Sequence, residues 1–472
     1  MNVLQGGPPR GMRDWGPTES RLRMQLIQKI SESYQLYGFS PIDTPAMETL
    51  DVLMGKNKGG DENEKLMFKI LKRGQALKTS LHDEATQEPE VTSESDLGLR
   101  YDLTVPLARF ISTHFSELQG HVFRCYHIGP VWRADRPQRG RFREFYQCDI
   151  DVIWAHHDWM YEVELFLATS RVLKALQLND FYIRLSDKRI LSLLFTGMGI
   201  LPQDVSKVSI VIDKIRKKKF DEIIREIESI GLHQELNQKI IDFLKKNSSY
   251  MDPSMKYFMT PSDFLKFNQD YLTQAARQSL EPILHAMQSI LENAKSLDPS
   301  LPIFFDPILV RGLDYYTGPI FEIGLKDSGY SFSIGGGGRY DSLIQTLGGP
   351  ADTAAVGLSL GFERLLMILL ERNKDFLSAQ GPQVGILLSP KLTEGMGIPL
   401  AEQIRNQGIP VSIYVSKKDF GKTMKMLEAA SMQWIVMEQH EAPRSYTIRN
   451  LFERQNYQWS FDELIQHLKM NP

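Results

Sequence analysis

Residues 122–152 read VFRCYHIGPVWRADRPQRGRFREFYQCDIDV. Two strand-like runs, 122–132 and 142–152, flank the segment ADRPQRGR. Pro137 and Gly140 disfavour a continuous strand in that segment, because proline lacks a backbone N–H and glycine weakens a strand interior. The pattern therefore predicts an antiparallel hairpin with a long tip.

One face of the second run is unusually polar. Alternation along a strand places on that face Arg141, Arg143, Phe145, Gln147, Asp149 and Asp151. Such polar side chains cannot face a dry core at a reasonable cost in free energy, so this face should line a polar cavity. Arginines at the base and tip of the hairpin can bind phosphates through paired hydrogen bonds. The alternative is an exposed edge hairpin with surface salt bridges.

Three later segments also have the composition of a binding site. LVRGLDYYTGPIFE (309–322) brackets charged and aromatic residues with glycines, although a turn with a structural tyrosine is an alternative. IGGGGRYD (334–341) lacks a following GK[ST], so we favour a flat substrate lying on a glycine strand over a phosphate loop. VGLSLGFERLLMIL (356–369) places Arg364 in the first turns of an apolar helix, where a paired structural arginine is the alternative.

The remaining pattern indicates an α+β fold built on an antiparallel sheet. Helices are predicted at 18–38, 103–114 and 159–176, and strands at 39–43, 181–186, 308–310 and 320–325. A flexible acidic loop is predicted at 88–96. Residues 190–300 are rich in amphipathic helices, which indicates a helical insertion domain between the two parts of the core, 1–189 and 301–377.

A second, smaller domain follows a linker-like segment at 378–383. Strands at 384–388, 411–415 and 434–437 alternate with helices at 398–406 and 420–432. This βαβαβ order predicts a three-layer α/β domain over 383–472 with a partly parallel sheet.

The composition is that of an ordinary globular protein. The 472 residues are 42% hydrophobic and 24% charged, which suits two or three domains. The net charge of −3 argues against nucleic-acid binding by overall charge, and the basic run at 214–219 is either a local patch or a solvated face. The two cysteines have no CxxC spacing, and no metal motif is visible. No apolar run approaches the ~18 residues of a membrane span. We therefore expect a cytoplasmic, non-membrane protein.

Together these segments resemble the class II aminoacyl-tRNA synthetases, and specifically the histidyl-tRNA synthetase family. WRAD (132–135) resembles motif 2 and GFERL (361–365) resembles motif 3, which define the class. LVRGLDYYTG (309–318) and GGGGRYD (335–341) look like the two histidine-specific signatures. FSPIDTPAME (39–48), with Pro45 and Glu48, looks like motif 1 of the dimer interface. Ser342 and Asp102 stand where glycine and glutamate are common in the family, and neither change removes an implied role.

The resemblance implies a role for each matched residue. Arg133 and Arg311 would contact the ATP α-phosphate as catalytic groups. The rest of ATP, with its Mg²⁺, would be held by Asp135, Arg141, Phe145 and Arg364. Histidine would be held by Asp102, Thr104, Gln147, Asp151, Tyr316 and Tyr340.

The implied activity is ATP-dependent ligation of L-histidine to its tRNA, through a histidyl-adenylate, by a cytoplasmic homodimer. The insertion domain would close over the tRNA acceptor stem. The 383–472 domain would bind the anticodon, with candidate phosphate contacts at Lys417, Lys418, Lys422 and Lys425. The alternative is the regulatory subunit of ATP phosphoribosyltransferase, a non-catalytic paralogue that typically lacks this domain and several ATP-binding arginines. A synthetase for threonine, proline or glycine would lack LVRGLDYYTG.

Overall fold

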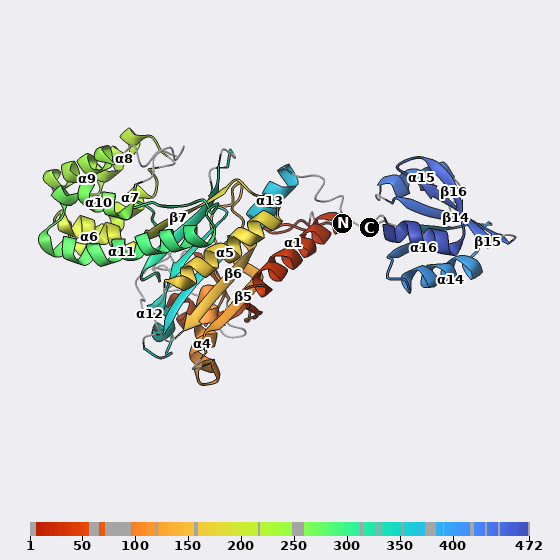
Figure 1. Ribbon diagram of the computed structural model, residues 1–472, viewed down its shortest axis with the longest axis horizontal. Coiled ribbons are helices and arrows are strands. Elements are labelled where there is room, and N and C mark those ends of the chain that lie inside the picture. Colours follow the sequence, from red (N-terminus) through yellow and green to blue (C-terminus); the bar gives the residue numbers. More distant parts are fainter. Residues whose placement is uncertain are drawn as a thin grey trace, which may run out of the picture. The chain divides into compact units, whose positions relative to one another are not determined.

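The computed structural model describes residues 6–55, 66–70, 96–118, 121–154, 159–215, 218–247, 259–311, 315–326, 329–330, 332–351, 353–372, 384–389, 391–415, 420–429, 432–441 and 444–470. The chain divides into two compact units, Met1–Ile368 and Leu369–Pro472. Figure 1 shows the elements of each unit.

An eight-stranded sheet forms the centre of the first unit, in the order β1-β5-β6-β11-β10-β9-β7-β8. Its strands are β1 (Ser40–Pro41), β5 (Phe123–Trp132), β6 (Glu144–Trp154), β7 (Phe181–Asp187), β8 (Ile303–Phe305), β9 (Pro319–Leu325), β10 (Gly335–Arg339) and β11 (Ala354–Gly361). The end pairs β1–β5 and β7–β8 are parallel, and every other pair is antiparallel. The predicted hairpin is confirmed as β5–β6, and the antiparallel-rich sheet confirms the predicted fold class.

A three-stranded sheet and six helices complete the core of this unit. The sheet has the order β2-β4-β3, from β2 (Met47–Thr49), β3 (Phe68–Ile70) and β4 (Leu97–Leu99). The helices are α1 (Pro17–Gln35), α2 (Leu50–Met54), α4 (Thr104–Leu118), α5 (Met160–Ala175), α12 (Asp341–Thr346) and α13 (Phe362–Arg372), which continues past the boundary at residue 368.

Helix α1 shows why these elements form. Pro17 lies in its first turn, where a missing N–H costs nothing, and Leu22, Leu26, Ile30 and Tyr34 recur at helical spacing. All four side chains are buried in the core, and the burial of each stabilises the fold by roughly 1.5–3 kcal/mol. Helix α1 contacts α5 and β5, and α5 contacts β6 and β11, so this helical layer covers one face of the sheet (Figure 1).

The predicted run of helices lies between β7 and β8. It comprises α6 (Lys188–Gly197), α7 (Pro202–Ile212), α8 (Phe220–Ser229), α9 (Gln234–Lys246), α10 (Pro261–Phe267), the 3₁₀ helix Gln269–Tyr271 and α11 (Gln274–Leu297). Within the basic run, Lys214 pairs with Glu226 at 2.8 Å and Lys218 pairs with the same carboxylate. These two lysines therefore behave as a solvated, paired face, and the exact limits of an insertion domain stay a prediction.

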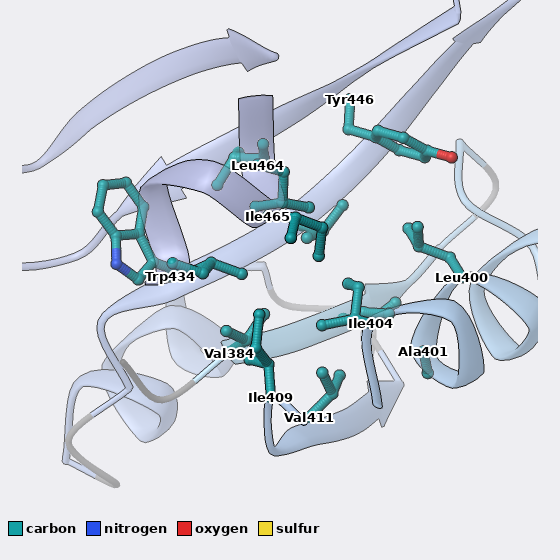
Figure 2. Packing of buried hydrophobic residues seen from close by; sticks show 14 of the residues in the cluster. Val384, Leu400, Ala401, Ile404, Ile409, Val411, Trp434, Tyr446, Leu464 and Ile465 are labelled. Carbon is teal, nitrogen blue, oxygen red and sulfur yellow. The ribbon is translucent and has the colours of Figure 1, made fainter. Parts of the chain in front are cut away.

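The second unit has its own sheet and core. Its elements are β12 (Val384–Leu388), α14 (Glu394–Arg405), β13 (Val411–Val415), α15 (Phe420–Ala429), β14 (Trp434–Glu441), β15 (Arg444–Asn450), β16 (Gln455–Trp459) and α16 (Phe461–Met470). The strand order is β13-β12-β14-β15-β16, with the first three parallel. Figure 2 shows Val384, Ile404, Trp434 and Leu464 converging between the sheet and its helices.

Several predicted elements differ from the structure. Residues 308–310 form no strand: the pairing with β7 ends at Asp306, whose carbonyl accepts a hydrogen bond from Leu309 in a turn. The strand predicted at 39–43 is only two residues long, and β15, β16 and α16 were not predicted. Residues 88–95 of the acidic loop, with Lys417 and Lys418, lie outside the described residues. Among the residues that are described, no helix combines the length and the apolar character needed to cross a membrane.

Candidate active site

A cavity of about 500 Å³ lies on the face of the eight-stranded sheet formed by β6, β10 and β11, beside the start of α13. Eleven of the twelve predicted site residues line it: Thr104, Arg133, Asp135, Arg141, Phe145, Gln147, Asp151, Arg311, Tyr316, Tyr340 and Arg364. The twelfth, Asp102, is buried but does not line the cavity. Residues that are far apart in the sequence therefore meet at one place.

Four arginines gather at one end of the cavity. Burial, together with the positive charges of Arg141, Arg133 and Arg311, lowers the pKa of Arg364 to about 10. Its Nε donates to the carbonyl of Gly140 at 2.9 Å, which holds it beside the hairpin tip. Mutually repelling guanidinium groups in a partly buried cavity favour an anionic ligand.

Arg311 is held against the glycine strand β10. A Cβ atom at Gly336 would lie 2.6 Å from Nη1 of Arg311, so a larger residue would push the guanidinium away. Nη1 of Arg311 lies 3.6 Å from the carboxylate of Glu322, which also pairs with Arg184. Gly335, Gly336 and Gly337 line the cavity, and the prediction that a flat substrate lies on this strand stays a prediction.

The other end of the cavity carries acids. The Tyr340 hydroxyl donates to Oδ1 of Asp151 at 2.6 Å. A Cβ atom at the facing Gly357 would lie 1.8 Å from that oxygen, so the pair needs a glycine on β11. Burial raises the pKa of Asp151 to about 7 and that of Asp102 to about 6. Buried acids that resist ionisation favour a ligand with cationic or N–H donors.

The predicted partners of the adenine ring lie in the same cavity without stacking on each other. The Arg133 guanidinium carbon is 5.2 Å from the centre of the Phe145 ring, and that of Arg364 is 5.3 Å from the centre of the Phe332 ring. Phe145 and Arg364 both line the cavity, so the predicted sandwich around a base stays a prediction.

One prediction on the hairpin face was wrong. Arg143 does not line the cavity, because regular pairing of β6 begins only at Glu144. Its backbone N–H donates to Gly11 at 2.8 Å and its Nε donates to the carbonyl of Asp135 at 3.1 Å. Arg143 therefore joins the N-terminal segment to the hairpin tip.

Some cavity residues were given no role from the sequence. Asp149 shares the period-two face of β6, and that signal did place it in a polar cavity. Tyr315, within the segment LVRGLDYYTG that the sequence singled out, and Ser359, without a comparable signal, also line the cavity. Glu363, within GFERL, accepts hydrogen bonds from Arg23 at 2.9 Å and from the backbone of Tyr146 at 2.7 Å, linking α1, β6 and α13.

Comparison with known proteins agrees with this geometry. A family model described as histidyl-tRNA synthetase matches residues 11–365. The chain is 36% identical over 405 residues to a probable histidine–tRNA ligase of Tropheryma whipplei, covering 86% of this chain and 89% of that protein. It is 31% identical over 470 residues to the histidine–tRNA ligase of Christiangramia forsetii, covering 98% of each.

Solved structures are similar over the same length. Histidyl-tRNA synthetase from Nostoc sp. PCC 7120 matches with a TM-score of 0.75 at 25% identity, covering 100% of both chains. A Bacillus halodurans protein described as an ATP phosphoribosyltransferase regulatory subunit/histidyl-tRNA synthetase matches with a TM-score of 0.67 at 19% identity, covering 92% of this chain and 99% of that one, and shares the fold. The family match, the relatives and the arginine- and acid-lined cavity lead to one conclusion: the chain belongs to the histidyl-tRNA synthetase family.

Proposed function

We propose that this protein ligates L-histidine to its tRNA in two steps, of which the first consumes ATP, with the cavity on β6, β10 and β11 as the active site. The observation that carries the proposal is the convergence of Arg133, Arg311 and Arg364 on the cavity that also contains Asp151 and its bound tyrosine hydroxyl. One end suits a polyphosphate, and the other suits an amino acid with N–H donors.

In the first step the histidine carboxylate attacks the α-phosphorus of ATP. The bond to the bridging oxygen breaks, pyrophosphate leaves with the electron pair, and histidyl-adenylate forms. Because the substrate supplies the nucleophile, the protein has to position the reactants and stabilise negative charge on the α-phosphate. Arg133 and Arg311 serve that purpose, and one such donor is worth ~3 kcal/mol, or about a hundredfold in rate.

The remaining cavity residues hold the two substrates. Phe145 and Arg364 enclose the adenine ring by stacking and cation–π attraction, Asp135 accepts from its amino group, and Arg141 lies beside the phosphates. Mg²⁺ enters with ATP as part of the substrate.

Histidine lies at the acidic end. Asp102, Gln147 and Thr104 bind its α-amino group, while Asp151, Tyr316 and Tyr340 surround the imidazole. An amino acid without ring nitrogens would leave Asp151 and its neighbours unpaired in a buried pocket, which disfavours it by several kcal/mol, on the order of a thousandfold or more.

In the second step a ribose hydroxyl at the 3′ end of the tRNA attacks the histidyl carbonyl and AMP leaves. The helices of residues 190–300 close over the acceptor stem. The 383–472 domain binds the anticodon, and its exposed Lys422 and Lys425 are candidate phosphate contacts. The active form is a cytoplasmic homodimer joined through the segment around Pro45 and Glu48.

Exchange of pyrophosphate into ATP tests this proposal. We expect exchange with histidine only, reduced about a hundredfold in Arg311→Ala. Arg277→Ala is the control, because Arg277 is a surface residue paired with Glu281 at 3.0 Å on α11, and it should leave exchange unchanged. Equal exchange with threonine or proline would contradict the proposal. Histidine binding without any exchange would instead favour the regulatory-subunit alternative.

A further inference from the structure

A carboxyl group without an assigned role lies at the acidic end of the cavity. Asp149 is on β6, two residues from Gln147 and two from Asp151, so all three side chains share one face. All three line the cavity, and Asp149 is only 3% exposed. A buried carboxyl in this position needs either a partner within the protein or a ligand.

The protein supplies hydrogen bonds to only part of the Asp149 carboxyl group. Ser359 on β11 faces Asp149 directly across the two strands. Nε2 of Gln147 donates to the Ser359 hydroxyl at 3.0 Å, and that hydroxyl hydrogen-bonds to the Asp149 carboxyl. Oε1 of Gln147 and Oδ1 of Asp149 remain buried with no hydrogen-bond partner in the described part of the chain. The chain of hydrogen bonds therefore leaves two buried acceptors without a partner on residues that line the cavity.

The charges around Asp149 indicate which ligand group fits. Burial raises the pKa of Asp149 well above its usual range, and the negative charges of Asp151 and Asp102 raise it further, while Ser359 and Arg133 lower it. Oδ2 of Asp102 is a third buried acceptor without a hydrogen-bond partner among the described residues. His127 faces Asp149 from β5, and burial lowers its pKa to about 4, so it adds no positive charge. The site has several acceptors and a surplus of acid, which an ammonium group with three N–H donors would satisfy.

We propose that Asp149 is a substrate-binding residue whose Oδ1, together with Oε1 of Gln147, accepts hydrogen bonds from the α-ammonium group of the amino-acid substrate. The inference rests on the proposed function and adds a second carboxylate to the implied recognition of that group. The imidazole is the less suitable partner, because the Tyr340 hydroxyl already pairs with Asp151 at the position assigned to the ring.

Binding of two ligands to Asp149→Asn distinguishes these partners. The ligands are histidine and 3-(imidazol-4-yl)propionate, which is histidine without its amino group, both measured by isothermal titration calorimetry. The substitution keeps the size of the side chain and removes its charge. We expect histidine to bind about ten- to a hundredfold more weakly, because a charged hydrogen bond is lost, and the propionate to bind unchanged. Asp149→Ser should give the same difference between the ligands, and KM for ATP should not change.

Asp187→Asn is the matched control. Asp187 lies on β7 of the same sheet, is 1% exposed and accepts from Nε of Arg189 at 2.9 Å, outside the cavity lining. It should leave the histidine affinity unchanged.

Two results would overturn the inference. Equal weakening of both ligands would place Asp149 against the imidazole, and unchanged histidine binding would show that Asp149 makes no contact. The proposed function fails separately, if the unsubstituted protein shows no histidine-dependent pyrophosphate exchange.

Discussion

Asp151 is a carboxyl whose environment favours the neutral form. Burial and the negative charge of Asp102 raise its pKa and the hydrogen bond from Tyr340 lowers it, with a net value of about 7. Near neutral pH this carboxyl therefore ionises readily once a positive or N–H donor group arrives. Binding and proton release become linked at this residue.

The stability of Asp151→Asn should depend on pH in a defined direction. The folded pKa of about 7 lies above the ordinary aspartate value of 3.8, so the wild-type free energy of unfolding falls as pH rises between these values. Asparagine cannot ionise, so its free energy of unfolding does not fall with pH for this reason. The Tm of the variant, relative to wild type, should therefore be higher at pH 8 than at pH 5. Calorimetry of the ligand-free proteins measures it, and an equal Tm difference at both pH values would contradict the prediction.

Local sequence patterns identified only some site residues. Alternation along β6 placed Gln147, Asp149 and Asp151 on one face because the strand is regular there. It misplaced Arg143, which precedes the regular pairing. Glu363 hydrogen-bonds to Arg23, which lies 340 residues away in the sequence, and no local sequence pattern predicts such a contact.

Among the single elements, strand β10 needs its glycines, because neighbouring atoms leave no room for a side chain. A Cβ atom at Gly337 would lie 2.0 Å from the carbonyl oxygen of Gly357, and one at Gly338 would lie 2.7 Å from that of Pro319. Both neighbouring strands therefore approach more closely than any side chain would allow. A Cβ atom at Gly336 would meet both a side chain and the backbone, since it would lie 2.6 Å from Nη1 of Arg311 and 2.7 Å from the carbonyl oxygen of Phe321.

Gly336→Ala should act on catalysis through Arg311. The added methyl group would lie 2.6 Å from Nη1 of Arg311 and 2.7 Å from the carbonyl oxygen of Phe321, so the guanidinium and strand β9 must both shift. Misplacing a catalytic group by ~1 Å can reduce the rate about a hundredfold. We expect kcat for histidine-dependent pyrophosphate exchange to fall by that order while KM for histidine changes little. Gly395→Ala is the control, since the new methyl group would meet no atom within 4 Å. A loss confined to KM would show that Gly336 does not position Arg311.

Element prediction succeeded where amphipathic spacing was strong and failed at short apolar runs. Residues 308–310 are apolar like a strand, yet Pro307 and the turn that begins at Asp306 end the pairing before them. Strands β15 and β16 were not predicted, although Tyr446 and Ile448 alternate with other residues as in a strand with one buried face. In the structure β15 pairs with β14, and β16 pairs with β15.

At the scale of the whole molecule, the chain has two units with separate cores. The core of the second unit includes Val384, Ile404, Trp434 and Leu464, all 4% exposed or less. A fragment of residues 369–472 should therefore fold on its own and unfold in one cooperative thermal transition. Circular dichroism at 222 nm would measure this, and a gradual loss of signal without a transition would show that the core needs the first unit.

The order of the eight strands also determines when the large sheet can close during synthesis. Asp151 on β6 pairs with Gly357 on β11, and every helix from α6 to α11 is translated between them. Those helices make mostly local contacts and can form while the nascent chain is still attached to the ribosome. Until residue 361 emerges, β6 keeps an open edge of unpaired backbone groups. A nascent chain on a ribosome that pauses within this interval therefore exposes an incomplete sheet. Chaperones can bind its unpaired edge, and aggregation can begin there.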